Sequence, residues 1–425
     1  MIGRGPVRGE ISVPGDKSIS HRAAMFAALA SGKSRVRGFL HAEDTLRTVS
    51  MMRALGAGIE GIAPSEMRIE GKGLRGLTEP ADIIDAGNSG TTIRIGSGIL
   101  AAQPFFSVVT GDRYLRRRPM ARVIRPLALM GAVIHARDGN RLPPIAIRGG
   151  ALKGIRYEMP VASAQVKSAL LLAGLWADAP VTVIEALPTR DHTERMLRSM
   201  GATVAVDGRA ITVSPAERLI PADVTVPGDI SSAAFFLVLA SLSPGSELVV
   251  RGVGVNPFRT GVVEVLRRMG ADIRYANERL ESGEPVADLV ARGGDLSGTS
   301  VAPEEIPGLV DEVPILCVAA AFAEGRTEIR GAEELRVKES DRIGAMVSGL
   351  SSLGVRCGEY PDGLWIEGPS TIRPTGPCDS RGDHRIAMSL LVLARAAGVN
   401  ILVKDTACID TSFPGFKAIL EGLSS

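Results

Sequence analysis

Basic residues gather at the places where the sequence predicts helices to begin. Lys17 and Arg22 lie in the polar stretch before the apolar run 23–30, and Arg385 opens another apolar run. A cation at a helix N-terminus opposes the helix dipole, so the arrangement is favourable when an anion binds beside it. Two phosphates and one or two carboxylates would match the whole set. The seven basic residues at such positions are Lys17, Arg22, Arg118, Arg190, Lys338, Arg342 and Arg385.

Two carboxylates stand among these cations. Asp311 precedes an apolar helical pattern, and Glu339 directly follows one of the lysines. A carboxylate held between cations and a substrate can act as a general base or a general acid. Lys17 could share either proton transfer, and the sequence does not divide the roles among the three residues. Asp16 and Asp341 are expected to cap helices instead.

Small polar residues begin several of the predicted helices. Ser18 follows the first Lys, and Gly90 belongs to the run Gly-Asn-Ser-Gly-Thr at 87–91. Ser163, Ala164 and Gln165 begin a third helix without bulky side chains. Small residues let an anionic ligand approach the free N–H groups of a first helical turn. These residues are therefore candidates for phosphate binding.

The elements that must position these residues form a repeat. Six segments are apolar on nearly every face of a helix, so each must be buried on every face. Each one begins at Asp, Asn or Ser, the residues that cap free N–H groups. The spacings between successive starts run from 66 to 82 residues. The expected starts are Asp16, Asn88, Ser163, Asp229, Asp311 and Asp383.

A second set of helices is more amphipathic and ends at a Leu-Gly or Met-Gly pair. Glycine is the usual residue just past a helix end, where φ becomes positive. Short alternating strands follow most of these pairs, as at 203–206 and 272–275. The sequence therefore predicts an α/β protein of six units of about 70 residues, with buried helices inside and sheets outside. The five clear pairs end at Gly56, Gly131, Gly201, Gly270 and Gly354.

A longer repeat divides the chain into two lobes. Val-Pro-Gly-Asp at 13–16 recurs at 226–229, and each copy is a natural crossing between lobes. We expect one lobe at 14–226 and a second at 1–13 plus 227–425, each made of three units. If the buried helices of each lobe run parallel, six N-termini converge on a cleft that suits a multiply charged anion.

The composition excludes several classes of function. The 49 basic and 47 acidic residues give a net charge of +2, which favours neither nucleic acid nor a membrane as a partner. The four cysteines form no C-x-x-C pair, so we expect no metal, no disulfide framework and a cytoplasmic protein. The longest apolar run, 233–242, is too short to span a bilayer, and no signal-peptide pattern is present. We expect a monomer, although the sequence leaves the oligomeric state open.

Seven stretches, in this order, resemble those of the 5-enolpyruvylshikimate-3-phosphate synthase family. The resemblance covers nearly the whole chain and implies that family's fold, a two-domain inside-out α/β barrel. The stretches at 163–167 and 190–194 resemble the subgroup called class II. The seven stretches are 14–22, 87–91 with Arg94, 118–119, 163–165, 311–312, 336–342 and 383–385.

The resemblance implies a reaction that needs no metal or organic cofactor. The 5-hydroxyl of shikimate 3-phosphate would attack C2 of phosphoenolpyruvate, C3 would be protonated, and phosphate would leave. Asp311 would accept the hydroxyl proton, Glu339 would deliver a proton to C3, and Lys17 would share either step. Shikimate 3-phosphate would be held by Lys17, Ser18, Arg22, Ser163, Ala164, Gln165, Arg190, Asp311 and Lys338. Phosphoenolpyruvate would be held by Lys17, Gly90, Arg118, Gln165, Arg342 and Arg385.

Three positions depart from patterns in that family. Gly90 stands where members that tolerate the inhibitor glyphosate often have Ala. Phe258 stands where the same members have Thr, so the sequence leaves glyphosate sensitivity open. Thr411 stands where many members carry a Lys, so one contact to phosphoenolpyruvate is absent or replaced.

Two other functions stay in view. The sister enolpyruvyl transferase that acts on UDP-N-acetylglucosamine resembles a chain with Lys-Asn near the first helix and a Cys in a mobile loop. Here Ser18 follows Lys17, and no cysteine precedes Cys317. A non-catalytic anion-binding module would keep the cations but would not need the pair Asp311 and Glu339.

Overall fold

The computed structural model describes residues 5–61 and 66–423, which fall into two compact lobes. The N-terminal lobe comprises Gly15–Val226 together with Glu281–Glu284. The C-terminal lobe comprises the described residues up to Pro14, Pro227–Leu280 and the described residues from Pro285 onward. The chain changes lobe within each of the two Val-Pro-Gly-Asp copies. The short piece 281–284, which the sequence analysis placed in the second lobe, packs with the N-terminal lobe instead.

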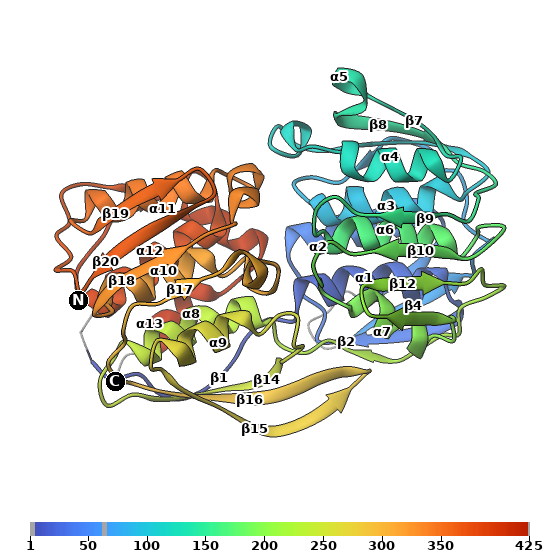
Figure 1. Cartoon of the computed structure of the whole chain (residues 1–425). Coiled ribbons are helices and arrows are strands. Elements are labelled where there is room, and N and C mark those ends of the chain that lie inside the picture. The colour runs from blue at the N-terminus through green and yellow to red at the C-terminus, as the bar shows by residue number, and fades with distance from the viewer. Residues whose placement is uncertain (1–4, 62–65, 424–425) are drawn as a thin grey trace. The chain divides into compact units, whose positions relative to one another are not determined.

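The N-terminal lobe has three apolar helices in its interior, with sheets and amphipathic helices around them (Figure 1). The interior helices are α1 (Lys17–Leu29), α3 (Gly90–Ala101) and α6 (Ala164–Gly174), of which α3 packs against both others. The outer helices are α2 (Glu43–Ala54), α4 (Ala121–Leu129) and α7 (His192–Ser199), with a short turn α5 (Arg137–Asn140) and a 3₁₀ turn at Leu115–Arg117. The strands are β2 (Ser31–Arg37), β3 (Gly58–Glu60), β4 (Glu66–Lys72), β5 (Ile84–Asp85), β6 (Phe106–Thr110), β7 (Val133–Ala136), β8 (Leu142–Arg148), β9 (Arg156–Glu158), β10 (Val181–Ile184), β11 (Val204–Asp207), β12 (Ala210–Val213) and β13 (Val224–Thr225).

The C-terminal lobe repeats the same plan. Its interior helices are α8 (Ile230–Ser241), α10 (Val313–Phe322) and α12 (His384–Ala397), and α8 packs against both others. The outer helices are α9 (Gly261–Arg268), α11 (Arg342–Ser352) and α13 (Phe416–Gly422), with 3₁₀ turns at Pro303–Gly308, Glu333–Val337 and Thr406–Thr411. The strands are β1 (Arg8–Ser12), β14 (Glu247–Gly254), β15 (Asp272–Glu281), β16 (Glu284–Arg292), β17 (Ser300–Val301), β18 (Gly325–Ile329), β19 (Arg356–Tyr360), β20 (Gly363–Gly368), β21 (Cys378–Asp379) and β22 (Val403–Lys404).

Each repeat has its own sheet, which follows one pairing rule. In the order β5-β6-β8-β7, β5 and β6 run parallel, and β8 runs antiparallel to both β6 and β7. The orders β13-β2-β4-β3, β9-β10-β12-β11, β1-β14-β16-β15 and β17-β18-β20-β19 repeat this arrangement. The parallel pairs β5/β6, β9/β10 and β17/β18 are each joined through a buried helix, as expected for parallel strands, which need a long crossover.

In two repeats, the first strand of the sheet comes from a distant part of the chain. The N-terminal strand β1 pairs in parallel with β14 of the C-terminal lobe. The strand β13, which directly precedes the C-terminal lobe in sequence, pairs in parallel with β2. Each lobe therefore contains one strand that lies next to a crossing in the sequence: β1 precedes the crossing at 14–15, and β13 precedes the crossing at 226–227.

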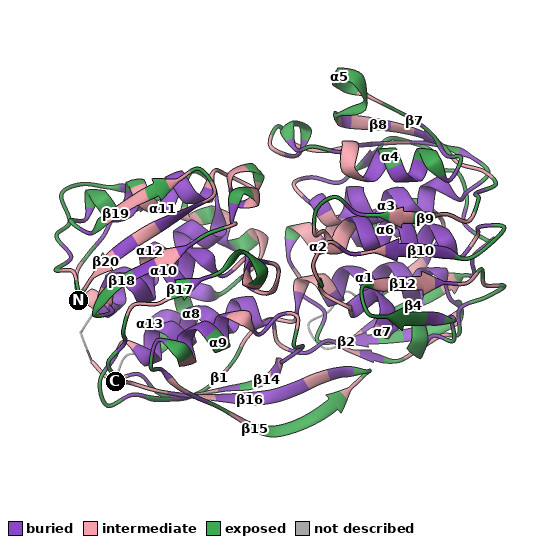
Figure 2. Cartoon of the chain, viewed as in Figure 1, coloured by how far each residue is buried: buried purple, intermediate pink, exposed green. Residues whose placement is uncertain are grey.

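The interior helices are buried along almost their whole length (Figure 2). Every residue of α8 is buried, and α10 is buried from Val313 to Ala321. A helix that is apolar on every face gains stability only if neighbours cover every face. The layering predicted from the sequence, with helices inside and sheets outside, is therefore confirmed.

Helix ends follow the predicted chemistry, with two one-residue corrections. The Asp16, Ser163, Asp229 and Asp383 side chains each accept a backbone N–H of the helix they precede. Gly56 and Gly131, after α2 and α4, have φ values of 94° and 104°. The predicted caps Asn88 and Asp311 are wrong by one residue, because α3 is capped by Ser89 and α10 begins after Glu312.

The reason for both corrections is that the expected caps bind guanidinium groups instead. The Asn88 amide oxygen accepts from Arg118, and the Asp311 carboxylate accepts from Arg342. The helix α4, which follows Arg118, begins at Ala121, after the 3₁₀ turn.

The sixth repeat is reduced. Its sheet has only β21 and β22, which run parallel, and α13 follows without a hairpin. This agrees with the weaker sixth copy of the Leu-Gly pattern at 420–422. Among the described residues, no helix combines the length and apolar character needed to cross a membrane.

Candidate active site

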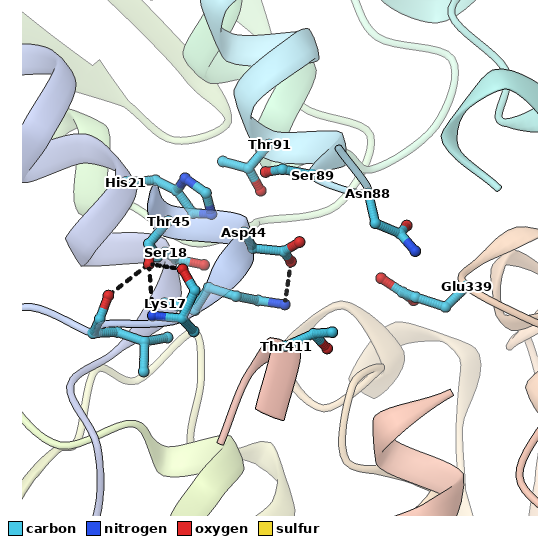
Figure 3. Close-up of polar contacts among 12 residues, drawn as sticks. Lys17, Ser18, His21, Asp44, Thr45, Asn88, Ser89, Thr91, Glu339 and Thr411 are labelled. Atoms are coloured by element: carbon cyan, nitrogen blue, oxygen red, sulfur yellow. Dashed lines mark hydrogen bonds and ion pairs between the residues drawn. The ribbon is translucent and has the colours of Figure 1, made fainter. Parts of the chain in front are cut away.

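The start of α1 presents Lys17 and Ser18. Lys17 Nζ lies 3.2 Å from an Asp44 carboxylate oxygen at the start of α2, as drawn in Figure 3. Both side chains stay partly exposed, at 20% and 13%. The Ser18 hydroxyl accepts from Arg190 at 3.3 Å. Because one exposed carboxylate only partly offsets the lysine and the helix N-terminus, this corner of the lobe suits an anion.

Arg22 is a buried cation held by neutral groups. Its guanidinium donates to the hydroxyls of Thr193 at 2.8 Å and Ser168 at 2.7 Å, and to the Ser18 carbonyl at 2.9 Å. Among the described residues, no carboxylate lies within ion-pair distance of it. Burial, with help from the nearby charge of Arg190, lowers the pKa of Arg22 to about 10. Arg22 therefore keeps its charge at neutral pH and gains from an anionic ligand.

A second cluster lies where α3 and α6 begin. The Gln165 side-chain oxygen accepts from Arg94 at 2.8 Å, and its amide donates to Thr91 at 3.1 Å. A Cβ added to Gly90 would lie 2.9 Å from Nη1 of Arg94 and 3.2 Å from Nη1 of Arg118. Because Gly90 has no side chain, the guanidinium groups of Arg94 and Arg118 can occupy their present positions without a steric clash.

Ser163 and Ala164 shape the start of α6. The Ser163 hydroxyl caps the helix by accepting from the Val166 N–H at 3.4 Å. The Ala164 carbonyl accepts from Ser168, whose hydroxyl also accepts from Arg22. The first turn of α6 is therefore joined through one serine to the buried arginine of α1.

In the C-terminal lobe, Arg342 holds three carboxylates at once. Its guanidinium reaches Glu339 at 2.7 Å, Asp383 at 2.9 Å and Asp311 at 3.3 Å. The side chain of Arg342 is only 2% exposed. Burial opposes its charge, but Asp383, Glu339 and Asp311 outweigh that effect and raise the pKa of Arg342. Asp311 and Glu339 therefore accept from the two terminal nitrogens of one guanidinium group, and Asp383 is the most buried of the three carboxylates.

Arg385 lies beside the same cluster. Its guanidinium donates to the Asp311 carbonyl at 3.0 Å and lies 3.8 Å from a Glu312 carboxylate oxygen. Glu312 is 1% exposed and also accepts from Ser231, and its burial raises its pKa. The buried Glu312 lies equally far, 3.8 Å, from Arg259. Glu312 therefore lies close enough to Arg385 for an ion pair but too far for a direct hydrogen bond.

Lys338 and Thr411 complete the predicted positions. Lys338 Nζ lies 3.3 Å from Glu334 in the preceding 3₁₀ turn. The Thr411 hydroxyl donates to the Cys408 carbonyl at 2.7 Å, within its own turn. Thr411 therefore uses its hydroxyl to close the turn and offers no cation where a Lys was expected.

A family model described as EPSP synthase (3-phosphoshikimate 1-carboxyvinyltransferase) matches residues 2–420. The chain belongs to the EPSP synthase family. A relative from Desulforudis audaxviator with the name 3-phosphoshikimate 1-carboxyvinyltransferase is 55% identical, over 98% of this chain and 97% of the relative.

Solved structures agree with this membership. EPSP synthase from Acinetobacter baumannii superposes with a TM-score of 0.89 at 46% identity, covering 99% of this chain and 97% of that one. The enolpyruvyl transferase NikO from Streptomyces tendae superposes with a TM-score of 0.81 at 18% identity, covering 99% and 96%. The second likeness concerns the fold alone, and it confirms the predicted enolpyruvyl transferase architecture.

Within each lobe of this EPSP synthase family member, the structure brings predicted site residues into contact. Ser18, Arg22 and Arg190 share direct hydrogen bonds. In the C-terminal lobe, Arg342 joins Asp311 and Glu339. The described residues contain no group of three or more His, Cys, Asp or Glu arranged for a metal ion.

Several residues that hold the predicted ones were not expected to do so. All but Asp44 lie within or next to a stretch that was already singled out, so adjacency was their sequence signal. The partners to which no binding or catalytic role was assigned are Asp44 for Lys17, Thr193 and Ser168 for Arg22, Asn88 for Arg118, Arg94 for Gln165 and Asp383 for Arg342. Arg259, next to Phe258, was also given no role, although its guanidinium donates to Asp229 and Ser231 at the start of α8.

Proposed function

We propose that this protein transfers the enolpyruvyl group of phosphoenolpyruvate to the 5-hydroxyl of shikimate 3-phosphate and releases phosphate. Membership of the EPSP synthase family supports the reaction type. The observation that carries the proposal is the pairing of Asp311 and Glu339 through Arg342. Two carboxylates fixed beside a cation suit a reaction that removes one proton and delivers another.

The chemical steps balance without a cofactor. The 5-hydroxyl oxygen bonds to C2 of phosphoenolpyruvate while Asp311 accepts the hydroxyl proton. Glu339 delivers a proton to C3, which gives a tetrahedral intermediate that still carries the phosphate. Glu339 then takes a proton back from C3 while the C2–O bond to phosphate breaks, and Asp311 gives its proton to the departing phosphate, so that the enol ether and inorganic phosphate are formed. Lys17 is a further group that could serve either proton transfer.

The N-terminal lobe is proposed as the main binding lobe for shikimate 3-phosphate. Its phosphate would bind near Ser18, Arg22 and Arg190, since Arg22 is buried and no carboxylate of the described residues lies within ion-pair distance of it. Fixed guanidinium groups match phosphate oxygens well. The remaining proposed ligands of shikimate 3-phosphate are Lys17, Ser163, Ala164, Gln165, Asp311 and Lys338.

Phosphoenolpyruvate carries a phosphate and a carboxylate, so it needs several cations. We assign these to Lys17, Arg118, Arg342 and Arg385, with Gly90 and Gln165 completing the contacts. The methyl-free Gly90 supports this assignment, because a side chain there would press on Arg94 and Arg118. Fork-shaped arginines are the residues of choice for such bidentate recognition.

One assay tests the proposal directly. Phosphate release from phosphoenolpyruvate is measured with shikimate 3-phosphate and, separately, with UDP-N-acetylglucosamine. We expect release only with shikimate 3-phosphate. Release only with UDP-N-acetylglucosamine would reassign the protein to the sister transferase. Binding of both anions without any release would reduce it to an anion-binding module.

The proposal also covers the oligomeric state and the compartment of the protein. We propose a monomer that acts in the cytoplasm, where its thiols stay reduced. The structure contains the free cysteines Cys317, Cys357, Cys378 and Cys408, which supports a reducing compartment. Light scattering coupled to size-exclusion chromatography should give a mass near that of one chain, 44.6 kDa.

A further inference from the structure

The hairpin formed by β15 and β16 ends in a two-residue turn that leaves its own lobe. Ser282 and Gly283 have φ values of 50° and 82°, the signs required of both central residues in a type I′ turn. Both strands belong to the sheet β1-β14-β16-β15 of the C-terminal lobe. Residues 281–284 nevertheless pack with the N-terminal lobe.

The tip makes several hydrogen bonds there. The Thr225 N–H donates to the Ser282 hydroxyl at 2.8 Å. Arg195 of α7 donates to the Gly283 carbonyl at 3.0 Å. His192, the first residue of α7, bonds through Nδ1 to a Glu284 carboxylate oxygen at 2.8 Å.

The contact between His192 and Glu284 is buried. Their side chains are only 2% and 6% exposed. A carboxylate costs free energy to bury unless it keeps good hydrogen bonds, so a buried acidic residue at a hairpin tip needs a partner of fixed geometry. The imidazole Nδ1–H supplies that hydrogen bond and thereby fixes the first turn of α7 against the tip.

The same turn of α7 holds Arg22. Thr193, the next residue, accepts from Arg22 at 2.8 Å and shares a 2.7 Å hydrogen bond with Ser168. Glu194 lies 2.7 Å from Lys167 of α6, a buried pair. The first turn of α7 is therefore tied to the hairpin tip by His192 and Arg195, and to Arg22 of the proposed phosphate site by Thr193.

We propose that Glu284 is a positioning residue for shikimate 3-phosphate, acting through His192 and Thr193 on Arg22. This rests on the proposed function, because it requires Arg22 to bind the phosphate of that substrate. Glu284 touches no substrate in this role. It sets the position of the helix start whose Thr193 hydroxyl orients the guanidinium.

The test is the equilibrium binding of shikimate 3-phosphate alone, by titration calorimetry, to folded variants. Outer partners that orient the ligands of a metal typically change affinity by about 10- to 100-fold, and we expect an effect of the same order here, so Glu284→Ala should raise the Kd for shikimate 3-phosphate by about tenfold. Glu284→Gln keeps an oxygen acceptor for His192 and should recover most of that loss. The KM for phosphoenolpyruvate should stay nearly unchanged in both variants.

Glu278→Gln is the matched control, because Glu278 is an exposed acidic residue of the same hairpin. It should bind as the unmodified protein does. A second check combines Glu284→Ala with Thr193→Val. If Glu284 acts through Thr193, the double variant should bind shikimate 3-phosphate no more weakly than Thr193→Val alone. The effects of the two substitutions on the binding free energy would then be strongly non-additive.

The outcomes separate the two proposals. If the unmodified protein neither binds nor turns over shikimate 3-phosphate, the proposed function fails. If it is active and folded Glu284→Ala binds shikimate 3-phosphate with unchanged Kd, the positioning role is wrong. If Glu284 has a purely structural role, Glu284→Ala should lower the melting temperature but leave the Kd for shikimate 3-phosphate unchanged, so that Glu284→Gln has no loss of affinity to recover. That result would also overturn the inference.

Discussion

Arg22 and Arg342 are both buried guanidinium groups, but their partners differ. Arg22 is held by hydroxyls and a carbonyl, whereas Arg342 is surrounded by Asp311, Glu339 and Asp383. A buried cation with only neutral partners gains most from an external anion. A cation that already balances three carboxylates acts chiefly to align them. This contrast is the basis for assigning Arg22 to binding and the carboxylates around Arg342 to proton transfer.

Glu339→Gln should leave the binding of both substrates nearly intact and lower kcat by roughly two to four orders of magnitude. The amide keeps the shape and an acceptor for Arg342 but cannot deliver a proton. Steady-state kinetics measure the effect. Glu333→Gln, an exposed residue of the preceding turn, serves as the control. A Glu339→Gln variant with unchanged turnover would remove Glu339 from the mechanism.

Gly90→Ala should raise the KM for phosphoenolpyruvate by about tenfold, equivalent to about 1.4 kcal/mol. The added methyl would lie 2.9 Å from Nη1 of Arg94 and 3.2 Å from Nη1 of Arg118, so one or both guanidinium groups must shift. The same variant should bind glyphosate more weakly. Gly150→Ala is the control, because a Cβ at Gly150 meets no atom within 4 Å. Equal KM values for the two variants would contradict this account.

At the scale of elements, hydroxyl chains join the starts of the helices. In the N-terminal lobe, His21 Nδ1 bonds to Thr48 at 2.7 Å, Thr48 to Thr92 at 2.6 Å, and Thr92 to Ser89 at 2.8 Å. This chain links α1, α2 and the start of α3, and Figure 3 shows His21 and Ser89 near the helix starts. Because the chain is buried, the starts of these helices are held in one arrangement.

His21 should make the stability of the protein depend on pH. Burial, assisted by the charges of Lys17 and Arg22, lowers the pKa of His21 well below its ordinary value. The unfolded chain therefore binds a proton near pH 6.5 that the folded chain does not bind, and stability falls as the pH drops below that value. The free energy of unfolding should therefore be lower at pH 5.5 than at pH 7.5.

Urea unfolding at the two pH values measures this loss. His21→Gln, which keeps a polar group for Thr48, should remove this contribution to the pH dependence. His135→Gln should not, because His135 lies exposed on β7. The same pH dependence in the protein and in His21→Gln would show that another group is responsible.

At the scale of the whole molecule, the proposed ligands of shikimate 3-phosphate come from both lobes. Ser18 and Arg22 belong to the N-terminal lobe, and Asp311 and Lys338 belong to the C-terminal lobe. One small molecule can satisfy both sets only if the lobes assemble around it. Neutralising the cations by a phosphate would favour that assembly.

Shikimate 3-phosphate at saturation should therefore reduce the radius of gyration measured by small-angle X-ray scattering. Shikimate, which carries only a carboxylate, should have a smaller effect at the same concentration, because it brings less negative charge to the cations. An unchanged radius of gyration with saturating shikimate 3-phosphate would count against closure driven by charge.

Much of the fold follows from local rules that the sequence carries. Burial of α8 and α10 follows from their lack of a polar face, and the helix starts follow from capping residues such as Asp16 and Asp383. The two wrong caps, Asn88 and Asp311, show the limit of these rules. Capping is a contact within three residues, whereas the guanidinium groups that took these side chains lie 30 and 31 residues away along the chain.

The sequence by itself determined the repeat, the buried helices and the set of charged residues that gather at helix starts. It could do so because periodicity and capping depend on near neighbours in the chain. Only the tertiary structure decided which charges pair: Arg342 with Asp383, Arg22 with Thr193, and Glu284 with His192. Those pairs join residues 41 to 171 positions apart, and such contacts are selected by packing, which no local pattern records.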